Sequence, residues 1–265
     1  MSRSYAMHIF REPKISLLAR QEYLGAEHVR WESDTEIPAQ TVAEFAGRLC
    51  YLSFGPDAGL EGGHKLIQGR TTNTEYLNNI LRTRHGSVLE HAVWTVLFEG
   101  VSRALTHELV RHRHFSYSQL SQRYVDESEV AFVLPPEIGG DQEAFDLFKQ
   151  SCERALADYR QLLARVEDQV KDEPSATLRR KRARQTARSL LPNATETKIV
   201  VTGNARAWRH FIELRASGGA DTEIRILAIK CLRLLQQEAP DLFGDYKITK
   251  TPDGTEIVDT EFRSV

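Results

Sequence analysis

The sequence predicts an α+β fold in which helices pack with a small mixed or antiparallel sheet. Two observations lead to this prediction. Helical periodicity covers most of the chain, and the few β-prone runs do not alternate with helices as βαβ units require. The chain of 265 residues is also long enough to bury a full core without disulfides or metals, as one large domain or two small ones.

In the first third of the chain, the expected elements are short. Residues 7–10 form a candidate strand, and apolar side chains three and four apart predict a helix over residues 41–51. A second helix over residues 73–83 should end before Gly86, because glycine is typical of helix ends. Residues 92–98, AVWTVLF, have the composition and length of a buried strand.

Helices dominate the remainder. Ser102 is a typical N-cap for a helix through RALTHELVRHR. Between residues 141 and 170 apolar positions three and four apart form a near-heptad seam of Phe145, Phe148, Cys152, Ala155, Tyr159, Leu162 and Val166. The other expected elements are a helix at 174–191 between two prolines, a strand at 197–202, a helix at 206–215 closed by Gly218 and Gly219, a helix that Asp221 caps and that runs to residue 237, and a hairpin within 247–258 around an Asp-Gly turn.

Composition excludes several classes of protein. The apolar fraction of 41% and charged fraction of 27% are ordinary for a globular protein, and no apolar run approaches the ~18 residues of a membrane span. The N-terminal residues lack the apolar core of a secretory signal, and three scattered cysteines argue for a reducing cytoplasm. With 35 Lys and Arg against 37 Asp and Glu, the net charge of −2 does not favour general nucleic-acid binding.

The segment HELVRHRHFSYSQLSQRY, residues 107–124, has the highest density of reactive side chains. Its basic triplet, residues 111–113, could simply complement a helix dipole, a contribution of roughly 0.3–1 kcal/mol per cation. That explanation leaves the following hydroxyl- and amide-rich residues unexplained. A loop rich in Ser, Gln and Arg supplies donors that suit phosphate, so we predict a phosphate-binding site here.

Three other motifs are weaker evidence for a functional site. His107 and His112 are five residues apart, whereas two zinc ligands on one helical face need a separation of four, so no metal site is expected. In the basic run 178–188, most charges are expected to face water, although Arg184 and Arg188 share a helical face and could reach a phosphate. The cysteines lie in apolar helical contexts, which disfavour a nucleophilic thiol.

Four blocks of the chain resemble the flavin-dependent thymidylate synthases, especially actinobacterial ones. They are the RHR triplet and Ser121, which are separated by seven residues, and the segments at 84–92, 179–197 and 200–217, within a resemblance that covers roughly residues 40–240. The resemblance implies a single domain over residues 1–265 with the thymidylate synthase-complementing fold, in a cytoplasmic homotetramer whose active sites are shared between subunits. It also implies conversion of dUMP to dTMP, with 5,10-methylenetetrahydrofolate as carbon donor, FAD reduced by NADPH as hydride source, and no cysteine nucleophile. No metal, nucleic-acid or membrane partner is expected.

The resemblance also transfers site residues. Those matching FAD contacts are Ser87, Arg111, His112, Arg113, His114, Gln119, Asn204, Ala205, Arg206 and His210. Those matching the dUMP site are Glu108, Leu109, Val110, Arg111, Gln119, Leu120, Ser121, Gln122, Arg123, Arg188 and Arg215, with Arg188 supplied by a neighbouring subunit. Arg215 is the candidate for polarising the uracil ring, and His85 the candidate beside the flavin. Many relatives have Glu where this chain has Gln119, which can bind but cannot act as a base.

Two alternatives come from other classes of protein. A non-catalytic nucleotide- or RNA-binding module would use the same basic loops without flavin, and its affinity would fall steeply with salt. A structural helical protein would use the seam within residues 141–170 for assembly and bind no nucleotide. A flavin enzyme acting on uracil in RNA is a nearer competitor, but the quoted blocks resemble the mononucleotide enzymes.

Overall fold

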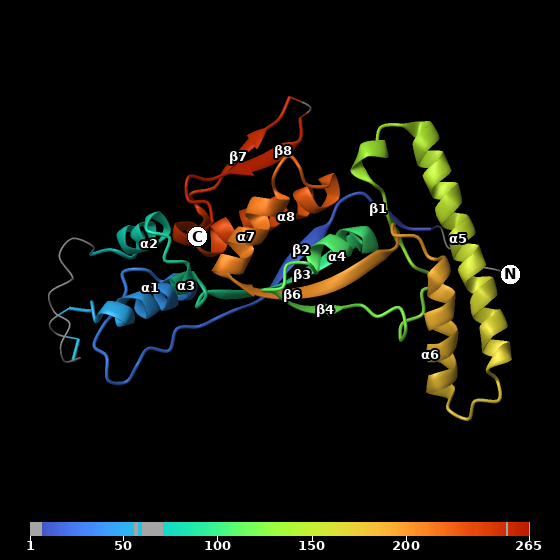
Figure 1. Cartoon of the computed structure of the whole chain (residues 1–265), viewed down its shortest axis with the longest axis horizontal. Coiled ribbons are helices and arrows are strands. Elements are labelled where there is room, and N and C mark those ends of the chain that lie inside the picture. Colours follow the sequence, from blue (N-terminus) through green and yellow to red (C-terminus); the bar gives the residue numbers. More distant parts are fainter. Residues whose placement is uncertain (1–6, 56–57, 60–70, 253, 265) are drawn as a thin grey trace. The chain divides into compact units, whose positions relative to one another are not determined.

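We analysed a computed structural model that describes residues 7–55, 58–59, 71–252 and 254–264. The chain forms two compact units (Figure 1). The first unit comprises Met1–Lys14, Leu97–Arg111 and Tyr117–Val200, and the second comprises Ile15–Val96, His112–Ser116 and Val201–Val265.

A four-stranded sheet confirms the predicted α+β class. Its order is β2-β3-β6-β4, formed by Lys14–Arg20, Val93–Ser102, Glu196–Asn204 and Ser116–Gln119. Alternate side chains of β3, including Trp94 and Val96, are buried, as expected for a strand with one face in the core. The strands predicted at 92–98 and 197–202 are confirmed and extended. Strands β2 and β4 were not predicted, and the residues of β4 were expected to form a loop.

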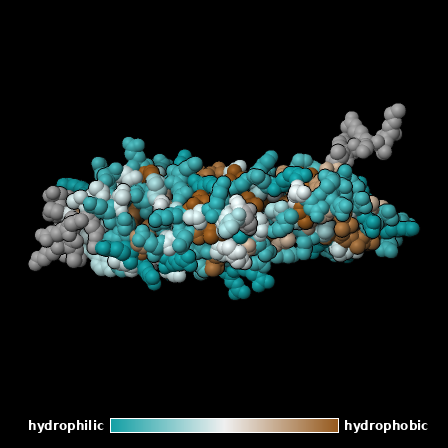
Figure 2. Space-filling model, turned by 90° about the horizontal axis from the view of Figure 1, so that it is seen from above, coloured by the Kyte–Doolittle hydropathy of each residue, from teal (hydrophilic) through white to brown (hydrophobic). Residues whose placement is uncertain are grey.

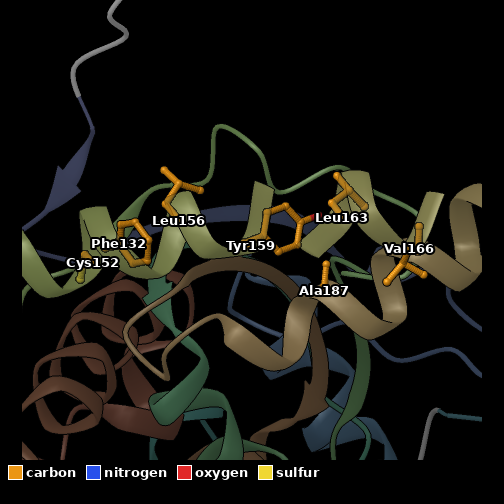
Figure 3. Close-up of a cluster of buried hydrophobic side chains, with 8 residues drawn as sticks. Phe132, Cys152, Leu156, Tyr159, Leu163, Val166 and Ala187 are labelled. Carbon is orange, nitrogen blue, oxygen red and sulfur yellow. The ribbon is translucent and has the colours of Figure 1, made fainter. Parts of the chain in front are cut away.

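In the first unit, α5 (Gln142–Gln169) and α6 (Ala176–Ala187) lie side by side (Figure 1). Asp141 caps α5 by accepting a hydrogen bond from Ala144 N at 3.0 Å. The predicted seam is confirmed at Cys152, Tyr159 and Val166, but the intervening buried positions are Leu156 and Leu163 rather than Ala155 and Leu162 (Figure 3). Adjacent positions lie 100° apart on a helix, and here the bulky leucines at 156 and 163 fill the core. Phe148 and Leu162 of the predicted seam pack against the same cluster and are partly buried.

The same unit contains the helix that precedes the basic triplet. Ser102 caps α4 (Arg103–Leu109) by accepting a hydrogen bond from Leu105 N at 3.0 Å, as predicted. The helix ends at Leu109, however, so Arg111 lies beyond it rather than in its last turn. The remaining elements are β1 (Ile9–Phe10), which pairs in parallel with β5 (Phe132–Val133), and the 3₁₀ helices η1 (Pro136–Ile138) and η2 (Arg188–Leu190).

In the second unit, the Trp208 and Phe243 side chains are fully buried in the core. Thr72 and Glu75 form a capping box at the start of α2, with Thr72 Oγ1 accepting from Glu75 N at 3.2 Å. The helices are α1 (Pro38–Tyr51), α2 (Asn73–Arg82), α3 (Gly86–Leu89), α7 (Ala205–Arg215), α8 (Thr222–Glu238) and α9 (Pro240–Phe243).

The end of α2 differs from the prediction. Gly86 does not close it but starts α3, and the left-handed residue is Arg84, with φ of 57°. The N–H groups of Arg84 and His85 donate to the carbonyls of Leu81 and Ile80, both at 3.1 Å, which is the Schellman arrangement. A non-glycine residue in this conformation costs about 1 kcal/mol, so no local pattern predicts arginine at this position.

The predicted closure of α7 is wrong, and the predicted cap of α8 is confirmed only in its position at Asp221. Gly218 and Gly219 do not adopt a left-handed conformation, because the carbonyl of Ala216 at the end of α7 instead accepts a hydrogen bond from Val258 N at 2.9 Å. The Asp221 side chain makes no capping hydrogen bond to α8. Both helices themselves are confirmed.

The predicted C-terminal hairpin is confirmed. Strand β7 (Lys247–Lys250) pairs antiparallel with β8 (Glu256–Asp259), and Gly254 has φ of 83°. The aspartate of the expected Asp-Gly turn lies outside the described residues.

The face seen in Figure 2 is largely hydrophilic, with hydrophobic residues in small groups. Exposed apolar side chains among the described residues include Leu147 on α5 and Leu214 on α7. No helix in the described part of the chain has the length and apolar character needed to cross a membrane.

Candidate functional site

The segment after the basic triplet is fixed to α7 by aromatic packing. The Phe115 ring lies 4.5 Å from Trp208 and 5.9 Å from Phe211, measured between ring centroids. This approach requires Gly203 at the end of β6, because a Cβ there would lie 2.3 Å from Phe115 Cδ1. A glycine within a strand often marks such a close approach. The position of residues 112–116 therefore depends on the absence of a side chain at residue 203.

His112 connects this segment to Arg215, the last residue of α7. Arg215 Nε donates a hydrogen bond to His112 Nε2 at 3.0 Å. Because arginine stays protonated, the acceptor nitrogen of His112 must be unprotonated in this arrangement. The imidazole is almost fully buried and packs edge-to-face with Phe211, with 5.2 Å between ring centroids, so its acceptor nitrogen is fixed in position for Arg215.

A cavity of about 480 Å³ opens beside the start of α7. This volume is within the range of roughly 300–1,000 Å³ for small-ligand sites. Asn204 caps α7 by accepting from Ala207 N at 2.9 Å, and Arg206 contacts Glu90 at 2.6 Å. The lining combines cationic, amide and hydroxyl groups, which suit a phosphorylated ligand, with one carboxylate, that of Glu90, which is paired with Arg206. The lining residues are Glu90, His114, Asn204, Arg206, Ala207, His210 and Ser264.

A second cavity in the same unit, of about 380 Å³, contains the candidate His85. Arg206 lines both cavities, which places Ser87 and His85 close to the first cavity. Cys50 and Arg84 also open onto this second cavity.

Within the first unit, hydrogen bonds fix the loop at residues 119–123. Arg103 Nη2 donates to the carbonyl of Leu120 at 2.8 Å, and Leu120 N donates to the carbonyl of Lys198 at 2.9 Å. Gln119 Nε2 donates to Thr106 Oγ1 at 3.1 Å, so this side chain has a bond to α4. The loop is thus rigidly mounted between α4 and β6.

The basic helix α6 packs against α5, and its Arg184 contacts the segment after the loop. Arg184 donates to the carbonyl of Tyr124 at 2.6 Å and pairs with Asp126 at 3.5 Å. It therefore braces residues 124–126, and the idea that Arg184 and Arg188 jointly reach a phosphate is not supported. Arg188 is exposed at the start of η2.

Glu127, which follows the loop along the chain, is a buried acid. Burial raises the pKa of its carboxyl to about 7, although the nearby Arg103 charge opposes the shift. Its ionisation in the folded state is unfavourable because the side chain is only 2% exposed.

Replacing Glu127 by glutamine should change the pH dependence of stability. The folded pKa of about 7 exceeds the reference value of 4.5, so the native state binds the extra proton between these values. The wild-type free energy of unfolding should therefore fall as pH rises from about 4.5 through 7. Glu127→Gln should match the wild type near pH 5 and exceed it at pH 8 by about 2–3 kcal/mol. Urea unfolding at both pH values tests this prediction. It is refuted if the difference in free energy of unfolding between variant and wild type is the same at both pH values.

Two further kinds of site, a metal-ligand cluster and a reactive cysteine thiol, concern the His, Cys, Asp and Glu side chains of the described residues. No group of three or more His, Cys, Asp or Glu is placed there to hold a metal ion. Burial raises the pKa of the Cys152 thiol to about 11, and it also raises the pKa of Cys231. Cys50 is exposed.

Comparison with known proteins decides the family. The family model described as thymidylate synthase complementing protein matches residues 34–241. A flavin-dependent thymidylate synthase from Mycolicibacterium vanbaalenii is 50% identical over 244 residues, covering 92% of this chain and 94% of the relative. The chain belongs to the flavin-dependent thymidylate synthase family. Proteins of the same name from Mycobacterium sp. strain JLS and Mycobacterium bovis are 52% identical over 251 residues and 48% identical over 244 residues, and cover 93% and 92% of this chain.

The residues that the family resemblance assigns to FAD and to dUMP separate largely by unit. The FAD set lies in the second unit except Arg111 and Gln119, and the dUMP set lies in the first unit except Arg215. In the second unit the structure brings His114, Asn204, Arg206 and His210 to one cavity. Ala205 is near them, but its N–H is bonded to the carbonyl of Ala92 at 2.8 Å.

The sequence analysis did not identify the residues that hold the candidate FAD- and dUMP-binding segments in place. Arg103 and Tyr117 hold the first unit's loops, the latter by donating from its hydroxyl to the carbonyl of Leu109 at 2.6 Å. Phe115 and Gly203 fix the histidine-bearing segment. The glycine in a β-prone run was the one available signal for Gly203, whereas Arg103 looked like an ordinary first-turn residue.

Proposed function

We propose that this chain methylates dUMP to dTMP, taking the methylene carbon from 5,10-methylenetetrahydrofolate and the hydride from FAD reduced by NADPH. The observation that carries the proposal is the hydrogen bond between Arg215 and His112, at 3.0 Å. It joins the candidate uracil-polarising arginine to a candidate FAD-binding histidine, within a family whose relatives bear the corresponding name.

The residues of the second unit fit FAD. Four candidate FAD residues line the 480 Å³ cavity, where cationic and polar donors complement the phosphates of a dinucleotide. Arg206 and His210 share one face of α7, four residues apart, and Ser87 lines the neighbouring cavity. When bound, FAD supplies the hydride that the methyl group requires. In this proposal His85 orients flavin or folate, or moves a proton.

Arg215 acts on the uracil. Methylation at C5 requires electron density there, and without a thiolate the site must polarise the ring. A guanidinium held beside N3 and its carbonyl stabilises negative charge on uracil, and the fixed His112 keeps it aimed. The phosphate of dUMP is bound by the candidate arginines and Ser121, with Arg188 from a neighbouring subunit.

The assembly proposed with this function is a cytoplasmic homotetramer with shared sites. The exposed position of Arg188 at η2 suits a residue that serves a neighbour's site. Size-exclusion chromatography with light scattering tests the tetramer directly.

An anaerobic visible spectrum tests the function. Added NADPH should bleach bound flavin, faster or further when dUMP is present, and dTMP should form when methylenetetrahydrofolate is added. A protein that binds no flavin when FAD is supplied would contradict the proposal and favour the nucleotide- or RNA-binding module. Bleaching without dTMP would contradict the proposed reaction alone.

Replacing Gly203 by alanine should weaken FAD binding. The added methyl group cannot fit beside the Phe115 ring, so residues 112–116 must move, at a cost typical of overpacking, about 1–3 kcal/mol. FAD affinity, measured by flavin fluorescence, should fall at least about tenfold. Gly219→Ala is the matched control, since no atom lies within 4 Å of its added Cβ. Equal FAD affinity in both variants would show that this segment does not bind the flavin.

A further inference from the structure

Arg84 occupies a backbone position that favours glycine. It follows the last turn of α2 with φ of 57°, in the left-handed residue of a Schellman motif. Strained residues of this kind persist where surrounding structure or function maintains them. The strain is not required to close the helix, because glycine would form the same two hydrogen bonds without it.

Among the described residues, the Arg84 side chain makes no contact that would stabilise the strained backbone. It is exposed, and no hydrogen bond or ion pair within the described ranges engages its guanidinium. Arg82, two residues earlier, differs in donating to Asn79 Oδ1 at 3.1 Å.

The surroundings of Arg84 are cationic. It opens onto the 380 Å³ cavity together with His85, Ser87 and Arg206, and the described lining contains no carboxylate. Arg206 is paired with Glu90 at 2.6 Å, whereas no described acid pairs with Arg84. A guanidinium in such a cavity favours a carboxylate or phosphate, which it can bind through two parallel hydrogen bonds.

We propose that Arg84 binds a carboxylate or phosphate of an anionic co-substrate that docks beside His85. This inference rests on the proposed function, which supplies two sources of that chemistry: the glutamate tail of the folate and the 2′-phosphate of NADPH. The strained backbone presents the guanidinium at the cavity, and Arg84 acts as a specificity-determining residue for whichever co-substrate carries the group.

Cys50 provides a binding readout that does not depend on turnover. It is exposed and lines the same cavity, whereas Cys152 and Cys231 are buried with raised thiol pKa values. A co-substrate bound in the cavity should slow alkylation of Cys50 by iodoacetamide, and the concentration that gives half-maximal protection measures its affinity. Methylenetetrahydrofolate and NADPH are tested separately, on the FAD-loaded protein.

In Arg84→Gly, the affinity for one of these two co-substrates should fall about ten- to hundredfold, the usual effect of losing a charge-assisted contact. If the folate tail is the ligand, tetrahydropteroate, which lacks glutamate, should bind wild type and variant equally. If the 2′-phosphate is the ligand, NADH should do so. Arg84→Lys should recover only part of the affinity, because ammonium cannot make the paired contact. The melting temperature of Arg84→Gly should equal or exceed that of the wild type.

Two control variants separate the charge and the strain. Arg82→Gln removes a cation from the same helix end outside the cavity, and Leu52→Gly relieves a left-handed residue of φ 48° at the end of α1. Both should leave protection of Cys50 unchanged. The proposal is overturned if Arg84→Gly retains wild-type affinity for both co-substrates, or if neither protects Cys50 in the wild type. A loss confined to FAD affinity would also overturn it, by making Arg84 a flavin ligand. Failure of the wild type to bind FAD would instead refute the proposed function.

Discussion

Arg215→Ala should lower kcat for dTMP formation by about a hundredfold or more while FAD remains bound. Removing one pre-aimed donor from a site of developing negative charge typically costs 10²–10³ in kcat. The Nε–H of Arg215 is committed to His112, so the orientation of the guanidinium is set before substrate arrives. The loss should appear in kcat more than in the KM for dUMP, because the interaction strengthens as charge develops.

Single-turnover kinetics with pre-reduced enzyme would measure the chemical step directly. Arg215→Lys should remain strongly impaired, since lysine cannot reproduce the Nε–H bond to His112. Arg233→Ala removes an arginine from an exposed pair with Glu256 and should retain wild-type turnover. An Arg215→Ala enzyme with full kcat and only a raised KM for dUMP would show that Arg215 binds the nucleotide without activating it.

Arg209→Ala should destabilise the protein by about 3–5 kcal/mol, the usual effect of removing one partner from a buried ion pair. The Arg209 side chain is fully buried in α7, and its two terminal nitrogens contact the two carboxylate oxygens of Asp245 at 2.7 and 2.8 Å. It also donates to the carbonyls of Leu242 and Phe262, at 2.7 and 3.0 Å. Its loss leaves a buried carboxylate and two carbonyls without these donors.

Urea unfolding at neutral pH would measure this effect. Arg263→Ala is the matched control, because it removes an exposed partner of Asp259 and should not change stability measurably. Arg209→Met combined with Asp245→Leu should be more stable than Arg209→Ala alone, since no charge is then left buried and unpaired. If the free energy of unfolding of Arg209→Ala lies within about 1 kcal/mol of the wild-type value, the ion pair with Asp245 does not anchor the C-terminal segment to α7.

Much of the fold followed from local patterns. The caps at Ser102 and Asp141 were predictable because the side chain bonds an N–H three residues later. The long helix α5 was predictable from its apolar spacing, and the C-terminal hairpin from its turn residues. The site residues came from motif resemblance, and physical reasoning alone reached only a phosphate-binding loop.

Strand β4 and the end of α7 show where local patterns failed. The polar segment SYSQ has no apolar alternation, and it forms a strand because a partner from residues far along the chain supplies its hydrogen bonds. The glycines after α7 were not needed as caps, since β8 supplies the closing N–H.

The sequence by itself determined the family, the α+β class, and the helices and caps that depend on neighbours within about four residues. Only the tertiary structure decided that Arg215 bonds His112, that Gly203 makes room for Phe115, and that Arg84 takes a left-handed conformation beside a cavity. The first two features join residues that are up to 103 positions apart in the chain. The third depends on the cavity beside the turn after α2. Their energies arise only after the core has packed, so no local pattern in the chain can specify them.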